Sequence, residues 1–144
     1  MTTTTPSHLA RALLLACVLP LLSTLGGCTT LADVREARGQ GTVRFYQQPA
    51  ERVWGVVPNA LNDVDLAVAG SDAQRGYYLA QRGATLMSRG ENVAVFVDDH
   101  AENMTRVEVV SKARDKGNLT ATNFETIVLD AIGVRLDEAD RQGP

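Results

Sequence analysis

The sequence predicts an α+β fold of two layers, in which an antiparallel sheet carries two helices on one face. Apolar residues recur at helical spacing over 53–64 and again over 124–136, which indicates two amphipathic helices. Valines alternate with other residues over 93–97 and 107–109, on either side of a polar stretch, and this is typical of an antiparallel hairpin. Together with three shorter segments of strand character, these elements give the order β-α-β-β-β-β-α.

The first strand and the first helix are predicted from short patterns at the start of the folded part. Val43 and Phe45 alternate with polar residues over 42–47, as expected of a half-buried strand. The helix is expected to begin at Pro49, because the missing N–H of proline costs nothing in the first turn. Pro58 lies inside the helical stripe and is expected to kink the helix or to end it early.

Two further short strands are predicted over 66–70 and 76–82, before the hairpin. The polar stretch 98–103 is expected to form the turn of the hairpin. Arg106 and Glu108 alternate with the valines of the second hairpin strand. Because successive side chains of a strand point to opposite faces, one face of the sheet is expected to face solvent.

The second helix is predicted to begin at a capping box, in which the side chains of Thr122 and Glu125 bond each other's backbone N–H groups. Its apolar stripe ends near Asp137, and the residues that follow are polar. The folded domain is therefore expected to span 42–138, with a polar tail over 139–144.

The N-terminal segment has the layout of a secretory signal. Arg11 precedes an apolar run over 12–22, which is too short to cross a bilayer as a helix. The run is followed by Leu25-Gly26-Gly27-Cys28, which resembles the lipobox of bacterial lipoprotein precursors. The resemblance implies cleavage between Gly27 and Cys28, and lipidation of Cys28 as the new N-terminus.

This resemblance also implies a location. Residues 1–27 would be the lipoprotein signal peptide and 28–41 a lipidated tether, which carries too little apolar surface to order itself and in which at most a short helical turn is expected. Several acyl chains on Cys28 would make the membrane anchor permanent. Thr29 stands where an aspartate would favour the inner membrane of a Gram-negative bacterium, so the expected location is the outer membrane, with the domain facing the periplasm.

Charge and cysteine content exclude some partners and bonds. The chain carries 14 basic and 17 acidic side chains, and such a mildly acidic domain gives no reason to expect binding to nucleic acid. Cys17 leaves with the signal and Cys28 is used by lipid, so we expect neither a disulfide nor a free thiol in the mature protein.

A second resemblance covers 42–138 in pattern. Val53-Trp54 in the first helix, the run 90–93 before the fourth strand, and a final helix that closes on Ile132 and Leu136 look like small Gram-negative lipoproteins of uncharacterised function. The layout is also similar to the helix-grip domains of the C component of the outer-membrane β-barrel assembly machine. The resemblance assigns no functional residue.

Candidate chemistry is sparse. Asp98, Asp99 and His100, with Glu102, form the only cluster of metal-ligand type, and we expect it to be a solvated hairpin tip rather than a metal site. A Ser-His-Asp arrangement would have to use His100, the single histidine after the signal. The possible nucleophiles are Ser71, Ser88 and Ser111. None stands in a nucleophile-elbow motif, so no catalytic residue, metal or cofactor is predicted.

Three classes of function follow from these observations. The leading one is a non-enzymatic, lipid-anchored envelope protein that binds another envelope protein, or serves as an accessory or structural module. An edge strand of the sheet could accept a partner strand by β-augmentation. The alternatives are a helix-grip domain that binds a lipid or another small apolar ligand, and a hydrolase that uses His100.

Overall fold

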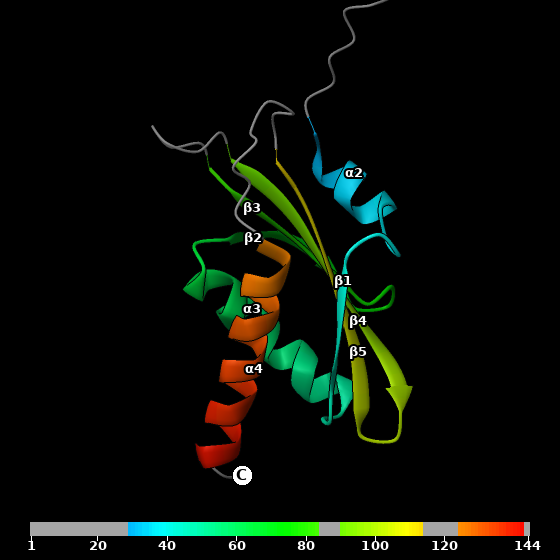
Figure 1. Cartoon of the computed structure of the whole chain (residues 1–144), viewed down its shortest axis with the longest axis vertical. Helices are drawn as coiled ribbons and strands as arrows, with labels where there is room; N and C mark the ends of the chain where they lie inside the picture. The colour runs from blue at the N-terminus through cyan, green and yellow to red at the C-terminus, as the bar shows by residue number, and fades with distance from the viewer. Residues whose placement is uncertain (1–28, 84–89, 114–123, 143–144) are drawn as a thin grey trace, which may run out of the picture.

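The computed structural model describes residues 29–83, 90–113 and 124–142, which form one sheet with helices on both faces (Figure 1). The strands lie in the order β1-β5-β4-β3-β2, and every pair is antiparallel. The elements in chain order are α2 (Leu31–Glu36), β1 (Thr42–Tyr46), α3 (Ala50–Asp63), β2 (Ala67–Asp72), β3 (Tyr77–Arg82), β4 (Glu91–Ala101), β5 (Met104–Ala113) and α4 (Phe124–Gln142). The predicted α+β class with an antiparallel sheet is confirmed.

The main core lies between the inner face of the sheet and the helices α3 and α4. The alternating valines of the hairpin supply the sheet side, and none of Val93, Val95, Val107 and Val109 is accessible to solvent. The helices contribute Val57, Leu61, Val128, Leu129 and Ile132, which are equally inaccessible. Burying one such side chain stabilises the fold by about 1.5–3 kcal/mol, so this cluster is the largest source of stability.

Helix α3 continues through Pro58 to Asp63, so of the two effects expected of this residue, a kink or an early end, the early end does not occur. Proline lacks the N–H that would bond the carbonyl of Trp54, four residues earlier. The hydroxyl of Tyr78 donates a hydrogen bond to that carbonyl at 3.3 Å. The ring centres of Trp54 and Tyr78 lie 4.1 Å apart. Strand β3 therefore satisfies the acceptor that the proline leaves without its helical partner.

The hairpin is longer than predicted, and the expected turn over 98–103 is wrong. Strand β4 continues to Ala101, and β5 begins at Met104, so that only two residues form the turn. One of them, Asn103, adopts a φ of 56°, the left-handed conformation that asparagine tolerates in tight turns. The polar residues of 98–101 thus belong to a strand.

Helix α4 is also longer than predicted, because it runs to Gln142 rather than ending near Asp137. The expected polar tail is helical over 139–142. Asp140 in this last turn forms an ion pair with Arg52 and accepts a hydrogen bond from Gln48 at 3.0 Å. These contacts to Gln48 and to the first turn of α3 explain why the helix continues past its apolar stripe.

The predicted capping box of this helix falls partly outside the described residues, which do not include Thr122. The carboxylate of Glu125 accepts hydrogen bonds from the backbone N–H groups of Thr42, at 3.1 Å, and Ser111, at 3.2 Å. Glu125 thus connects the start of α4 to the sheet.

The segment that precedes β1 is folded onto the sheet, which corrects the expectation that it buries too little apolar surface to be ordered. Helix α2 packs Val34 and Ala37, both buried, against the outer face of the sheet. Its partners there are Ala94, Phe96 and Val110. Thr30 and Asp33 form a capping box at its start. Leu31 of α2 also packs against this cluster, so a few apolar residues are enough because the sheet presents a matching apolar surface.

We expect Val34→Asp to release α2 from the sheet, because an unpaired carboxylate in this contact costs several kcal/mol. Ala32→Asp is the matched control, since it places the same charge on the exposed side of the same helix. Trypsin cleavage after Arg38, followed by mass spectrometry, should be accelerated roughly tenfold or more by the first substitution alone. Equal cleavage of both variants would contradict the docking of α2.

Candidate functional site

Beyond the end of α2, the outer face of the sheet continues toward the hairpin turn. Two rows of cross-strand neighbours cross it. The first row joins Val43 of β1, Glu108 of β5 and Phe96 of β4. The second row joins Phe45, Arg106 and Asp98 in the same strand order. Side chains opposite each other on one face are in contact distance, so apolar and charged groups alternate along this surface.

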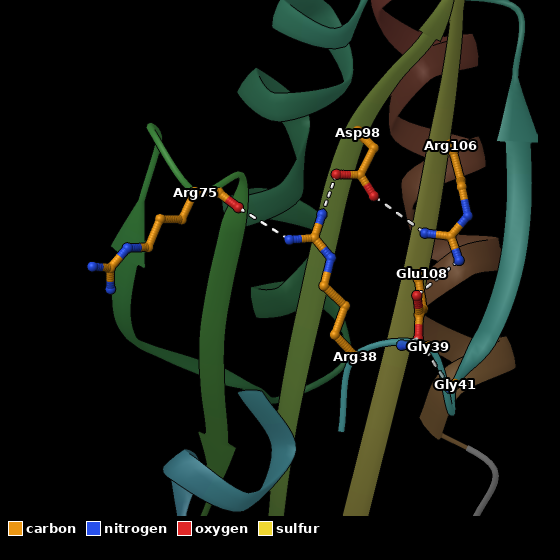
Figure 2. A network of polar contacts seen from close by, with 7 residues as sticks. All are labelled: Arg38, Gly39, Gly41, Arg75, Asp98, Arg106 and Glu108. Carbon is orange, nitrogen blue, oxygen red and sulfur yellow. Dashed lines mark hydrogen bonds and ion pairs between the residues drawn. The ribbon is translucent and has the colours of Figure 1, made fainter. Parts of the chain in front are cut away.

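The charged groups form a chain of ion pairs, which we call the Arg38–Glu108 network (Figure 2). Arg38, which follows α2, pairs with one carboxylate oxygen of Asp98, and Arg106 pairs with the other at 3.2 Å. Arg106 then pairs with Glu108 at 2.8 Å. The Arg38 guanidinium also lies 4.9 Å from the ring centre of Phe96, a cation–π contact. The network thereby connects α2 to both strands of the hairpin.

Glu108 is the buried end of this network, with no side-chain surface accessible to solvent. Its carboxylate accepts hydrogen bonds from the backbone N–H groups of Gly39 and Gly41, the latter at 3.1 Å. Gly39 has a φ of +89°, and a Cβ on Gly41 would come within 2.1 Å of the Val109 carbonyl oxygen. Glycine is therefore required at both positions for the backbone to approach this carboxylate.

The electrostatics of Glu108 follow from these contacts. Burial acts to raise the pKa of its carboxyl group, but Arg106 and the two glycine N–H groups outweigh burial and lower that pKa below its ordinary value of 4.5. The same hydrogen bond raises the pKa of Arg106, because it stabilises the charged form of both groups. Glu108 is therefore an ionised carboxylate at neutral pH, held in a fixed position under the surface.

Beside the network lies a small apolar surface formed by Val43, Phe45 and His100, which we call the outer patch. Phe45 is 50% exposed and Val43 is 39% exposed, although both are large apolar residues. The ring of His100 lies 4.8 Å from that of Phe45. Strand β1 is at the edge of the sheet, and within the described residues it pairs only with β5.

A groove of about 810 Å³ lies on the other side of the network, between the end of α2 and the β2–β3 turn. Charged groups of both signs line it, among them Arg35, Arg75 and Asp99. Arg38 also faces this groove, but it already pairs with Asp98 and donates to the Arg75 carbonyl at 3.5 Å. The groove is therefore not prearranged to bind an anion.

The structure separates the residues of the predicted polar cluster. Asp98 belongs to the ion-pair network, His100 stacks on Phe45, and Asp99 and Glu102 are exposed. Within the described ranges, no group of three or more metal-ligating side chains converges. Asp98, Asp99 and His100 thus belong to strand β4 and not to the hairpin tip that was expected, whereas Glu102 does lie in the turn.

His100 is also distant from the serines that the structure describes. Ser111 lies on the neighbouring strand, where its hydroxyl donates to the Glu91 carboxylate. The register pairs Ser111 with Val93, seven residues before His100, which corresponds to about 23 Å along the strand. Ser71 lies on β2, two strands away from β4. Ser88, with the predicted cleavage and lipidation residues Gly27 and Cys28, lies outside the described residues.

Sequence reasoning did not identify the network or the outer patch. Glu108 stands between Val107 and the run Val109-Val110, and an acidic residue inside such an apolar run is a signal of a buried, paired carboxylate. Arg38 carried no such signal, because its role depends on the docking of α2. Phe45 was predicted to be on a strand, but its exposure depends on which part of the face α2 covers.

Comparison with known proteins adds little to this geometry. No protein-family model matches the chain, and no curated protein matches it in sequence. Among solved structures, CalU16 from Micromonospora echinospora is similar with a TM-score of 0.40 and 11% sequence identity, over 65% of this chain and 73% of that chain. That likeness is too low to support an argument about function. In the described part of the chain, no helix is long and apolar enough to span a membrane.

The lowered pKa of Glu108 predicts how its contribution to stability depends on pH. The unfolded state binds the proton more readily, so the contribution is complete above about pH 4.5 and is lost as pH falls through the lower pKa of the folded state. Glu108→Gln should therefore reduce the free energy of unfolding by about 2 kcal/mol at pH 7, and by less at pH 3. Urea denaturation at both pH values measures the difference.

Glu102→Gln is the control, because Glu102 lies exposed in the hairpin turn and should show no such change. Glu91, whose pKa is raised by burial, titrates in all three proteins and cancels from the comparison. A difference between wild type and Glu108→Gln that stays constant or grows on acidification would contradict the buried, ionised carboxylate.

Proposed function

We propose that this protein is a lipid-anchored envelope protein that faces the periplasm and binds another envelope protein without catalysing a reaction. The observation that carries the proposal is the outer patch, where two large apolar side chains of an edge strand remain exposed. The lipobox resemblance at Gly27 and Cys28 supports the anchor and, with Thr29, an outer-membrane location.

The geometry of β1 suits partner binding by strand addition. A strand at the edge of a sheet offers unpaired backbone groups, which a partner strand can bond, while alternate side chains supply specificity. Val43 and Phe45 alternate along β1 on the outward face and would form those specific contacts. The half-exposed Phe45 beside Arg106 also has the aromatic and arginine composition that dominates binding energy at protein interfaces.

The two alternative functions find less support. A helix-grip ligand site needs space between the last helix and the sheet, whereas Val128, Leu129 and Ile132 fill this interface with no accessible surface. A hydrolase needs a base within hydrogen-bond reach of its nucleophile, whereas His100 stacks on Phe45 far from Ser71 and Ser111. Protein binding requires neither a cavity nor such an arrangement.

The anchor is tested by Cys28→Ser. Serine cannot form the thioether to lipid, so we expect the precursor to accumulate uncleaved, or a mature form to be released from membranes. Membrane fractionation and intact mass measurement distinguish these forms from the acylated wild type. A Ser variant that still yields an acylated, membrane-bound mature protein would contradict lipidation at Cys28.

Partner binding is tested by a photo-crosslinking amino acid at position 45, introduced in intact cells. We expect a discrete crosslinked product that disappears when the nearby substitution Val43→Glu adds a charge to the outer patch. Position 134 on α4 is the matched control, because Val134 is also a large apolar residue, 54% exposed, but lies on a helix that covers the opposite face. The same products from positions 45 and 134 would contradict a specific site at the outer patch.

A further inference from the structure

The fold begins almost at the predicted lipidation site, which restricts how the domain can lie on a membrane. The carbonyl of Thr29 accepts a hydrogen bond at 2.7 Å from the side chain of Asn92, a residue only 2% exposed. Thr30 caps α2, and Lys112 donates to the carbonyl of Asp33 at 3.0 Å. The chain is thus attached to the sheet from Thr29 onward.

Only one peptide unit separates Thr29 from Cys28, a Cα–Cα distance of about 3.8 Å. The headgroup region on each side of a bilayer is roughly 5–8 Å thick. A lipid on Cys28 therefore leaves no free tether long enough to lift the domain away from the headgroups, although a tether over 28–41 was expected from the sequence.

The attachment point defines one end of the molecule. Asn92 pairs with Gln81 of β3 and with Lys112 of β5, so the end of β3, the start of β4 and the end of β5 lie together there. We call this the anchor end. The hairpin turn and the C-terminus of α4 lie at the opposite end (Figure 1). Because β4 has eleven residues, about 33 Å separates the two ends.

We propose that the lipid on Cys28 holds the domain directly against the bilayer in a fixed orientation, with the anchor end on the lipid headgroups and the β4–β5 turn facing away. This rests on the proposed lipidation of Cys28. The surface that the anchor end fits is the headgroup layer of the same membrane that takes up the lipid.

The test uses the mature lipidated protein, extracted from membranes and reconstituted in vesicles of phosphatidylethanolamine with a minority of phosphatidylglycerol. One cysteine is added for a fluorescent label, either Gly83→Cys at the anchor end or Glu102→Cys in the hairpin turn. A Cβ at Gly83 meets no atom within 4 Å, and Glu102 is exposed, so both labels should be tolerated. Cys28 does not compete for the label, because its sulfur carries the lipid.

With a nitroxide quencher on the lipid headgroups, we expect position 83 to lose most of its fluorescence and position 102 to lose almost none. The control inserts about 20 Gly and Ser residues, beginning with threonine, between Cys28 and Thr29, which allows an average reach of about 25 Å. We expect this insertion to remove most of the difference between the two positions while the protein still sediments with the vesicles.

The possible failures are distinguishable. Protein that does not sediment with vesicles, or lacks the mass of the lipid, would overturn the anchor and the orientation together. Protein that sediments but shows equal quenching at positions 83 and 102, or stronger quenching at 102, would overturn the orientation alone and leave the proposed anchor intact.

Discussion

The β4–β5 hairpin is the element on which the rest of the structure depends, because it is buried on both faces. Its inward valines pack against α3 and α4 in the main core. On the outward side, Ala94, Phe96 and Val110 pack against α2. Strands β1 and β3 pair with its two edges, and the helices α2, α3 and α4 also contact it directly. A hairpin buried on both faces must have apolar residues on both faces.

Among the charged residues that the structure describes, Glu108 is the most deeply buried, and it lies in the middle of this hairpin. Burying an unpaired carboxylate would be strongly destabilising, so its presence requires partners with good geometry. Arg106 and the N–H groups of Gly39 and Gly41 supply them. Both of these N–H groups belong to the segment that leads from α2 into β1, so Glu108 binds this segment specifically. The carboxylate thereby fixes where α2 leaves the sheet.

Much of the fold could be predicted from periodicity alone, and the differences have identifiable causes. The periodic spacing of apolar residues predicts the hairpin and both large helices, because each of these elements buries the face that carries those residues. The continuation of α3 through Pro58 depends on a hydroxyl from Tyr78, which is distant in sequence and invisible to local reasoning. Helix α2 is stable because a surface made by three other segments receives Val34 and Ala37. Interactions of this kind become predictable only once the sheet order is known.

The candidate site was predicted less well than the fold, for a related reason. The polar residues 98–101 resemble a turn when only their composition is considered. In the structure Asp98 remains in the strand because Arg38 and Arg106 bind its two oxygens, and one of these arginines comes from a segment 60 residues earlier. The outer patch is exposed because α2 covers only part of the outer face of the sheet. The sequence pattern does not predict how much of that face the helix covers.

The position of the outer patch relative to the anchor end constrains any partner. Phe45 lies in the same cross-strand row as Asp98, which follows Asn92 by six residues, or about 20 Å along β4. Under the proposed anchoring, the patch stands at about this height above the headgroups, and the short connection to Cys28 prevents it from moving far from that height. A partner must then present its binding segment close to the membrane surface, which favours another protein of the same membrane over one that diffuses freely. The same rigidity lowers the entropy lost on binding, because the orientation of the patch is already restricted before the partner arrives.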